Sequence, residues 1–274
     1  MKMTTECVSR MVGALAGDVA GSVYEFDNIR CKDFALFAPY HGNECRPTDD
    51  SLMTIAIAKA LWESRDDASD LEENAVRCMR EIGQRFPTCG YGGKFFEWMY
   101  SEHPKPYHSF GNGAAMRVSP VSYFATSLSH AEQLAEKVTC VTHNHPEGIK
   151  GAKVVAGLGY LALQGESKEM LRAYAEKFYD ISFSLDEIRP SYQFNASCME
   201  TVPQAIVAFL EAKDFEDALR NAISIGGDSD TLAAIAGGMA GAYYGIPKNI
   251  FNQVISRLDE NLEHEISLLW NMNT

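Results

Sequence analysis

The sequence lacks the cysteine spacing of a disulfide framework or a zinc ribbon. Its seven cysteines are odd in number, widely separated and never arranged as a C-x-x-C pair, which is typical of free thiols in a reducing compartment. An apolar signal-peptide core is also missing before Met11, and the apolar run that follows contains Asp18. We therefore expect a cytoplasmic protein without a cleaved leader.

Positive charge is scarce, and long apolar runs are absent. The 24 lysines and arginines are outnumbered by 37 aspartates and glutamates, which gives a formal net charge of −13. General nucleic-acid binders and basic membrane-surface proteins both need a positive surface, so we expect neither kind of partner. The most apolar stretch, residues 232–247, is shorter than a membrane span and rich in Gly and Ala. The acidic excess leaves room for a site that binds cations.

Strand-type alternation of apolar and polar residues is missing as well, and apolar residues recur instead at helical spacing. Ten segments show this spacing: residues 11–22, 52–62, 71–86, 131–141, 148–163, 168–178, 202–210, 215–225, 231–244 and 250–270, the last of which could form two helices. The 274 residues are 46% hydrophobic and contain no tandem repeat or linker-like tract. We therefore predict a single all-α domain over residues 1–274, built as a compact multi-helix bundle.

Two of these helices carry glycines four residues apart on one face. The glycines are Gly13, Gly17 and Gly21 in the first, and Gly237, Gly241 and Gly245 in the second. Each interior glycine costs a helix up to ~1 kcal/mol relative to Ala, so three on one face need a reason. Close approach of another backbone is the usual one. We expect both helices to lie at the centre of the bundle, and they could pack against each other.

Two of the predicted helices begin with acidic motifs. Pro-Thr-Asp-Asp-Ser occupies residues 47–51, and Gly-Gly-Asp-Ser-Asp-Thr occupies residues 226–231. Helix capping alone explains either motif, but one cap needs only one side chain. If the two helix ends meet, their four carboxylates require cations or strongly raised pKa values. Oxygen donors from Asp and Thr suit Mg²⁺ or Mn²⁺ better than zinc. Capping and metal binding both remain open at this point.

Other candidate residues lie beside helix ends. Glu25 follows the first glycine helix, either as a solvated acid or, since an acid there is electrostatically unfavourable, for another purpose. The glycine-rich segments at residues 90–93 and 109–117 are either ordinary turns or places where backbone N–H groups hold a phosphate. Neither matches a dinucleotide or P-loop motif. His143 and His145 read first as a helix cap or buried histidines, and only second as ligand-binding groups.

In combination, these motifs resemble the ADP-ribosylglycohydrolase family, of the type that activates dinitrogenase reductase. The marks of the resemblance are the Gly-Ala-Leu-Ala-Gly-Asp run at residues 13–18 with Glu25, the two acidic motifs, the segment at residues 109–117, and Thr142-His143. The resemblance implies an all-α fold with two Mg²⁺ or Mn²⁺ ions at helix N-termini. It also implies a metal-dependent hydrolase that cleaves the glycosidic bond between ADP-ribose and a protein side chain or small molecule, and releases ADP-ribose.

The resemblance carries roles over to individual residues. The implied metal ligands are Thr48, Asp49, Asp50, Asp228, Asp230 and Thr231. The implied catalytic groups are Glu25, as a mobile carboxylate, and Asp228. The implied ADP-ribose groove is lined by Gly90, Tyr91, Gly92, Ser109, Phe110, Gly111, Asn112 and His143. We expect Asn112 and His143 to serve binding more than the chemical step, because they lie in loops that are remote in sequence from the acidic motifs.

The nature of the acceptor stays open. A recognisable segment with the extra aspartate of the arginine-specific branch is not found after Trp98, and the loop at residues 90–92 resembles the branch that cleaves O-linked ADP-ribose. Two further functions remain as alternatives. A two-metal phosphohydrolase would use the same acids, and a catalytically silent ADP-ribose-binding module would not need both acidic motifs.

Overall fold

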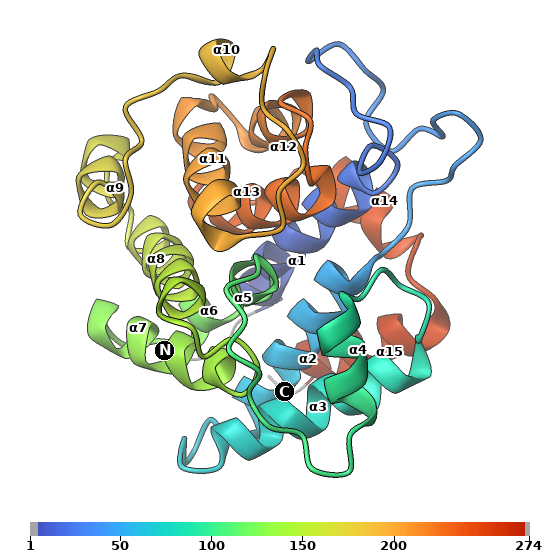
Figure 1. Ribbon diagram of the computed structural model, residues 1–274, viewed down its shortest axis with the longest axis vertical. Helices are drawn as coiled ribbons and strands as arrows, with labels where there is room; N and C mark the ends of the chain where they lie inside the picture. The colour runs from blue at the N-terminus through green and yellow to red at the C-terminus, as the bar shows by residue number, and fades with distance from the viewer. Residues whose placement is uncertain (1–4, 272–274) are drawn as a thin grey trace.

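Helices follow one another along almost the whole chain (Figure 1). The computed structural model describes residues 5–271, and the side chains of residues 9–267. The helices are α1 (Thr5–Gly21), α2 (Asp49–Glu63), α3 (Leu71–Arg85), α4 (Gly93–Tyr100), α5 (Gly113–Met116), α6 (Val121–Phe124), α7 (Leu128–Cys140), α8 (Pro146–Leu163), α9 (Lys168–Ala175), α10 (Leu185–Ile188), α11 (Cys198–Glu211), α12 (Phe215–Ser224), α13 (Ser229–Tyr244), α14 (Lys248–Ile255) and α15 (Glu260–Asn271). Within the described part of the chain, strand-like pairing is confined to two isolated bridges. The predicted all-α single domain is confirmed.

Each of the ten predicted helical segments contains a helix, and the last one divides into α14 and α15. The short helices α4, α5, α6 and α10 were not predicted as separate elements. They have four to eight residues, which is too few to show a repeating apolar period. The sequence indicates only the glycine-rich turns from which α4 and α5 begin.

The helices α1 and α13 pack against each other at the centre of the molecule (Figure 1). Their contact is so close that a Cβ atom at Gly17 would lie 1.8 Å from the backbone oxygen of Ala233, and one at Gly13 would lie 2.4 Å from that of Gly237. Only glycine fits at such a distance, which confirms the expected role of the two glycine faces.

One member of the second glycine face was assigned wrongly. Gly245 is not in the interface but is the C-cap of α13, with φ of 72°, and a Cβ added there would have no atom within 4 Å. Glycine is common at this position because it adopts a left-handed backbone without strain. The regular four-residue spacing therefore led us to include Gly245, although this residue lies just after the end of α13.

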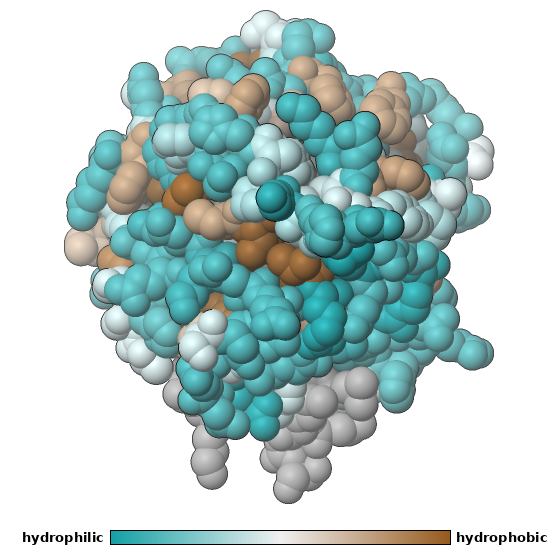
Figure 2. Space-filling view, turned by 60° about the horizontal axis from the view of Figure 1, so that its bottom comes forward, coloured by the Kyte–Doolittle hydropathy of each residue, from teal (hydrophilic) through white to brown (hydrophobic). Residues whose placement is uncertain are grey.

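The remaining helices surround this central pair. The helices α11 and α12 cover one side of α13, α8 packs against α13 and α7, and α2 lies between α1 and α3. None of the described helices is long and apolar enough to cross a membrane. The face shown in Figure 2 is mainly hydrophilic, with apolar side chains gathered in a hollow near its middle, as expected for a chain of this net charge.

Candidate active site

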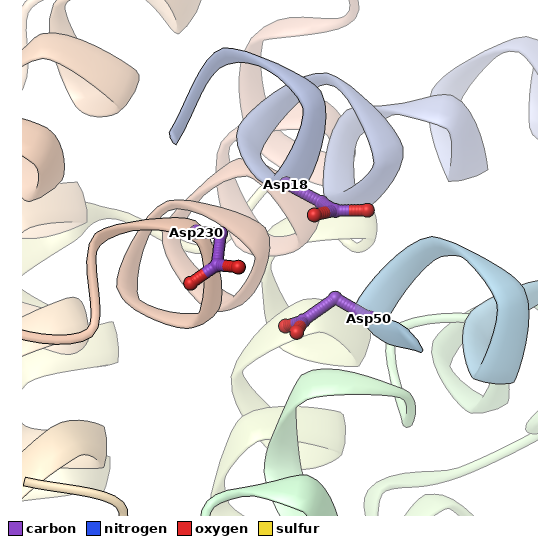
Figure 3. A group of neighbouring side chains, drawn as sticks. All are labelled: Asp18, Asp50 and Asp230. Atoms are coloured by element: carbon purple, nitrogen blue, oxygen red, sulfur yellow. The ribbon is translucent and has the colours of Figure 1, made fainter. Parts of the chain in front are cut away.

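The two acidic motifs meet at the C-terminal end of α1. Carboxylate oxygens of Asp18, Asp50 and Asp230 lie within 4.8 Å of one another, and they come from α1, α2 and α13 (Figure 3). A second group, made by Glu25, Asp228 and Asp230, is equally close. Asp230 belongs to both groups. The structure thus brings together acids from distant parts of the chain in two adjoining clusters that could hold metal ions.

Asp18 is the member of this site that the sequence analysis missed. It lies fully buried in α1, and its carboxylate accepts hydrogen bonds from the backbone N–H and hydroxyl groups of both Thr48 and Ser51. Three of these donors bind Oδ2 and one binds Oδ1, so most of the acceptor capacity of the carboxylate is used by the start of α2. Asp18 therefore holds the start of α2 in place. The sequence does contain an indication of this role, because Asp18 is an acidic residue within an otherwise apolar predicted helix.

The helix-capping explanation applies to the first motif only. Thr48 is the N-cap of α2, and its side chain accepts a hydrogen bond from the N–H of Asp50. Asp228 occupies the N-cap position of α13, but its side chain makes no capping bond. Asp50 Oδ2 accepts the Thr231 hydroxyl at 3.2 Å, whereas its Oδ1 is buried without a hydrogen-bond partner. An orphaned carboxylate oxygen is costly, and a bound cation would satisfy it.

The second cluster is held by the loop that follows α1. The Asn28 side chain donates to the backbone oxygen of Gly227 at 2.9 Å and accepts from the N–H of Gly227 at 2.8 Å. Gly227 has φ of 76°, and a Cβ there would lie 2.4 Å from the ring of Tyr192, so glycine is required on both counts. This pairing keeps Glu25 beside the second acidic motif, and Asn28 was not identified from the sequence.

Burial and mutual repulsion raise the pKa values of these acids. Burial raises the pKa of Glu25 to about 7, with a further contribution from the charges of Asp228 and Asp18. Burial, followed by the charges of Asp18 and Asp228, raises the pKa of Asp49 to about 8. The pKa values of Asp50 and Asp230 are raised well above the usual range for the same two reasons. Acids in this state gain from a positive ion that replaces their protons.

A cavity of about 460 Å³ opens beside the acids, a size that suits a small-molecule ligand. Most of the predicted site residues line it: Glu25, Asp49, Asp50, Gly90, Gly92, Ser109, Gly111, Asn112, His143, Asp228, Asp230 and Thr231. Thr48 lies buried behind this lining. The segments predicted from separate motifs therefore form one continuous wall.

Two predicted groove residues, Tyr91 and Phe110, are not among the residues that line the cavity. The ring of Tyr91 stacks on Phe95, with centroids 5.6 Å apart, so it belongs to the apolar packing of α4. Phe110 is 47% exposed and touches the edge of His145. In both cases the neighbouring residues line the cavity while the apolar ring contacts another aromatic ring, and a sequence motif does not reveal this direction.

The two histidines near residue 144 have different surroundings. His145 is the N-cap of α8, where its ring accepts a hydrogen bond from the N–H of Glu147, as the capping interpretation expects. His143 is buried and lines the cavity. Its pKa is lowered well below the usual value, first by burial and then by the charge of Arg117. The histidine ring at the cavity is therefore neutral.

Several cavity residues were not identified from the sequence. Phe26 and Phe194 stack at 6.1 Å across the cavity lining, one from the loop after α1 and the other from the loop before α11. Lys94, at the start of α4, and Arg117, which follows α5, add positive charge to the wall. These residues are far apart in the chain, and only the tertiary structure brings them together.

Comparison with known proteins identifies the family. A family model described as ADP-ribosylglycohydrolase matches residues 6–270. The human ADP-ribosylhydrolase ARH3 is 28% identical over 312 aligned positions, which cover 86% of this chain and 84% of ARH3. The ADP-ribosyl-dinitrogen reductase glycohydrolase of Rhodospirillum rubrum is 26% identical and covers 93% of this chain and 90% of its own.

A solved structure shows the same architecture. A chain of an ADP-ribosylglycohydrolase-related protein complex superimposes with a TM-score of 0.65 at 25% sequence identity, over 97% of this chain and 99% of that chain. The residues matched by the family model, 6–270, include both acidic motifs and all residues that line the cavity. The chain described here is a member of the ADP-ribosylglycohydrolase family.

Proposed function

We propose that this protein is a metal-dependent hydrolase that cleaves the glycosidic bond between ADP-ribose and an acceptor, and so releases ADP-ribose. The observation that carries this proposal is the pair of acidic clusters sharing Asp230 at one wall of the 460 Å³ cavity. Membership of a family of ADP-ribosylglycohydrolases supports the same reaction. The acceptor is a protein side chain or a small molecule.

We propose that two Mg²⁺ or Mn²⁺ ions occupy the acidic clusters. The ligands would be Thr48, Asp49, Asp50, Asp228, Asp230 and Thr231. These residues offer only oxygen atoms, which hard divalent ions prefer, and the buried, unpartnered Oδ1 of Asp50 fits such an ion. When bound, the ions would polarise the ribose hydroxyl groups and lower the pKa of water.

The protein's own groups would handle the proton. Glu25 and Asp228 face the cavity, and either carboxylate can accept a proton from the attacking water as the bond to the ribose breaks. Asp228 Oδ2 is engaged by the Asn112 amide at 2.7 Å, which favours Glu25 as the more mobile base.

The rest of the cavity would hold the ADP-ribose moiety. Its wall carries the glycine-rich segments of residues 90–93 and 109–113 together with His143. Glycine backbone permits close approach of a diphosphate to N–H groups. We further propose that the protein acts in the cytoplasm on ADP-ribosylated proteins or ADP-ribose conjugates, with no nucleic-acid partner. Its free cysteines and excess negative charge are consistent with both statements.

The acceptor is best identified by a product assay. Serine-, arginine- and small-molecule-linked ADP-ribose would each be incubated with the protein, with and without Mg²⁺, and the products measured by mass spectrometry. We expect intact ADP-ribose and free acceptor from at least one substrate, only when Mg²⁺ is present. Release of AMP or phosphate would instead identify a two-metal phosphohydrolase. Tight binding of ADP-ribose without any turnover would identify a binding module.

A further inference from the structure

Arg117 is a buried cation without a carboxylate partner. Its side chain is only 1% exposed, and no acid of the described chain lies within ion-pair distance of it. Burial lowers its pKa to about 10, so it remains charged at neutral pH. Its Nε is buried with no hydrogen-bond partner. The Phe95 ring centroid lies 5.8 Å from its guanidinium carbon, and the charge of Asp49 favours the charged form. Neither replaces a hydrogen-bonded acid, so the buried charge is costly and needs a reason.

The hydrogen bonds of Arg117 lead to His143. Its Nη2 donates to the hydroxyl of Thr142 at 2.5 Å and lies 3.2 Å from Nδ1 of His143. The Thr142 hydroxyl is itself 2.7 Å from the same Nδ1. The hydroxyl also lies 3.4 Å from the backbone oxygen of Thr139, a longer contact. Because a guanidinium can only donate, the contact between Arg117 and Nδ1 is a hydrogen bond when Nδ1 is the acceptor. The neutral ring of His143 must then carry its proton on Nε2.

The other side of the ring faces the cavity. Nε2 is the side-chain atom nearest to a Cβ built on Gly113, at 3.2 Å, and lies 3.5 Å from one built on Gly111. Both glycines line the cavity, as does His143. Within the described residues, Nε2 makes no hydrogen bond to a protein acceptor. The ring thus presents an unused N–H donor at the glycine-rich wall.

We propose that Arg117 is a positioning residue that fixes His143 as the Nε2–H tautomer, so that the cavity offers a donor to an anionic oxygen of the ligand. The charge of Arg117, which also lines the cavity, favours the same anion. That the anion is the diphosphate of ADP-ribose rests on the function proposed above. The assignment of the tautomer does not.

The tautomer can be measured without any ligand. Long-range ¹H–¹⁵N spectra of the labelled protein distinguish a protonated ring nitrogen from an unprotonated one. We expect His143 to show a protonated Nε2 and an unprotonated Nδ1 in the wild type and in Arg117→Lys, which retains a cationic donor. A protonated Nδ1 in the wild type would overturn the proposal, and this result needs no variant to fold.

A double-mutant cycle tests whether Arg117 acts through His143. Calorimetric titration with ADP-ribose should show about tenfold weaker binding for both Arg117→Met and His143→Ala, as expected for loss of a donor to a charged group. The double variant should bind within about twofold of His143→Ala, and Arg117→Lys should restore most of the affinity. Additive losses in the double variant would show that Arg117 acts independently of His143, and would contradict the proposal.

A failure of the proposed function can be distinguished from a failure of the role proposed for Arg117. If wild-type protein does not bind ADP-ribose, the identity of the ligand is wrong, whereas the tautomer of His143 is still measured by NMR without ligand. Loss of the Nε2–H tautomer in Arg117→Met would support the role of Arg117, and an unchanged tautomer in that variant would contradict it. If Arg117→Met does not fold, the comparison is made with Arg117→Lys. That variant keeps the charge but has no planar fork to reach Thr142 and His143 together. We expect it to bind ADP-ribose less tightly than the wild type and more tightly than His143→Ala, and affinity no better than that of His143→Ala would contradict the proposal.

Discussion

The side-chain amide of Asn112 donates a hydrogen bond to Oδ2 of Asp228 at 2.7 Å. The two residues are far apart in sequence, and Asn112 also contacts the hydroxyl of Thr201 at 3.2 Å. The amide therefore joins the glycine-rich wall of the cavity to the second acidic cluster. Asn112 was expected to serve ligand binding more than the chemical step, and this contact shows that it also orients one of the acids.

Because of this hydrogen bond, substitutions of Asn112 and His143 should differ in their effect on metal binding. We expect Asn112→Ala to weaken Mg²⁺ or Mn²⁺ binding by roughly 10–100-fold, the usual effect of removing a group that orients a metal ligand, and to lower turnover as well. His143→Ala should weaken ADP-ribose binding while the metal affinity is unchanged. Calorimetric titration of each variant with metal, and then with ADP-ribose, measures both quantities. Equal metal affinity in Asn112→Ala and wild type would refute the role of the amide.

The shared position of Asp230 makes Asp230→Asn the sharpest test of the metal site. Metal that binds only the native state stabilises it by about 2.7 kcal/mol at a hundredfold excess over Kd. We expect this variant to lose that stabilisation and its activity, while the chelated protein becomes slightly more stable because one repelling charge is gone. Melting curves in chelator and in Mg²⁺ provide the measurement.

A matched control for Asp230→Asn is Asp66→Asn, whose side chain is 90% exposed. This variant should behave as the wild type in both melting curves. Because Asn supports a helix start about as well as Asp, a purely structural role for Asp230 predicts no effect either. Full activity and an unchanged response to metal in Asp230→Asn would contradict the proposed metal site.

The raised pKa values predict how the metal-free protein responds to pH. The folded-state pKa values of Glu25, about 7, and Asp49, about 8, exceed those of the unfolded chain. The folded protein therefore binds more protons, and its free energy of unfolding falls as pH rises through this range. In chelator, the melting temperature should decrease by several degrees between pH 6.5 and pH 8.

Metal should reverse this trend, because the ion replaces the protons. We expect the increase in melting temperature caused by Mg²⁺ to be larger at pH 8 than at pH 6.5. Lys168 and His143 have lowered pKa values and change stability in the opposite direction, but they contribute to both curves. The difference in melting temperature between the Mg²⁺ and chelator curves therefore reports on the acids alone. If this difference did not change with pH, the prediction would be contradicted.

Because α1 and α13 lie so close together, replacement of Gly17 by alanine should strongly lower the free energy of unfolding. A Cβ at Gly17 would lie 1.8 Å from Ala233 O, an atom of the backbone that cannot rotate away. Gly17→Ala should therefore destabilise the protein by about 3 kcal/mol or more, at the upper end of overpacking effects. Gly93→Ala, at a helix start with no atom within 4 Å, is the control and should change stability by less than about 1 kcal/mol. Chemical denaturation of both variants checks this order.

Local patterns were sufficient to predict most of the fold. Apolar spacing located the longer helices, and the glycine faces of α1 and α13 indicated which two helices meet, because both signals are contiguous in the chain. The acidic motifs were likewise recognisable, since each of them occupies a single helix start. Gly245 shows the limit of such spacing, because the same residue type also ends a helix.

The missed features depend on contacts between distant segments. Asp18 could not be assigned because its four donors come from the start of α2. Asn28 is remote in sequence from Gly227, and the role inferred for Arg117 depends on its contact with His143. The direction of the Tyr91 ring is set by packing on Phe95. Sequence motifs thus indicate which segments approach the ligand, and tertiary packing decides which side chains do.

The helix α1 is the common support of both acidic clusters, since Asp18 holds the start of α2 and the glycine face holds α13. A Cβ at Gly21 would lie 2.6 Å from the Cα of Asp230 itself. During synthesis, α1 and α2 leave the ribosome long before α13 is made, and contacts between distant segments form slowly. The nascent chain consequently has only part of the acidic site. A metal ion held by both acidic motifs would therefore be taken up only after α13 has docked on α1.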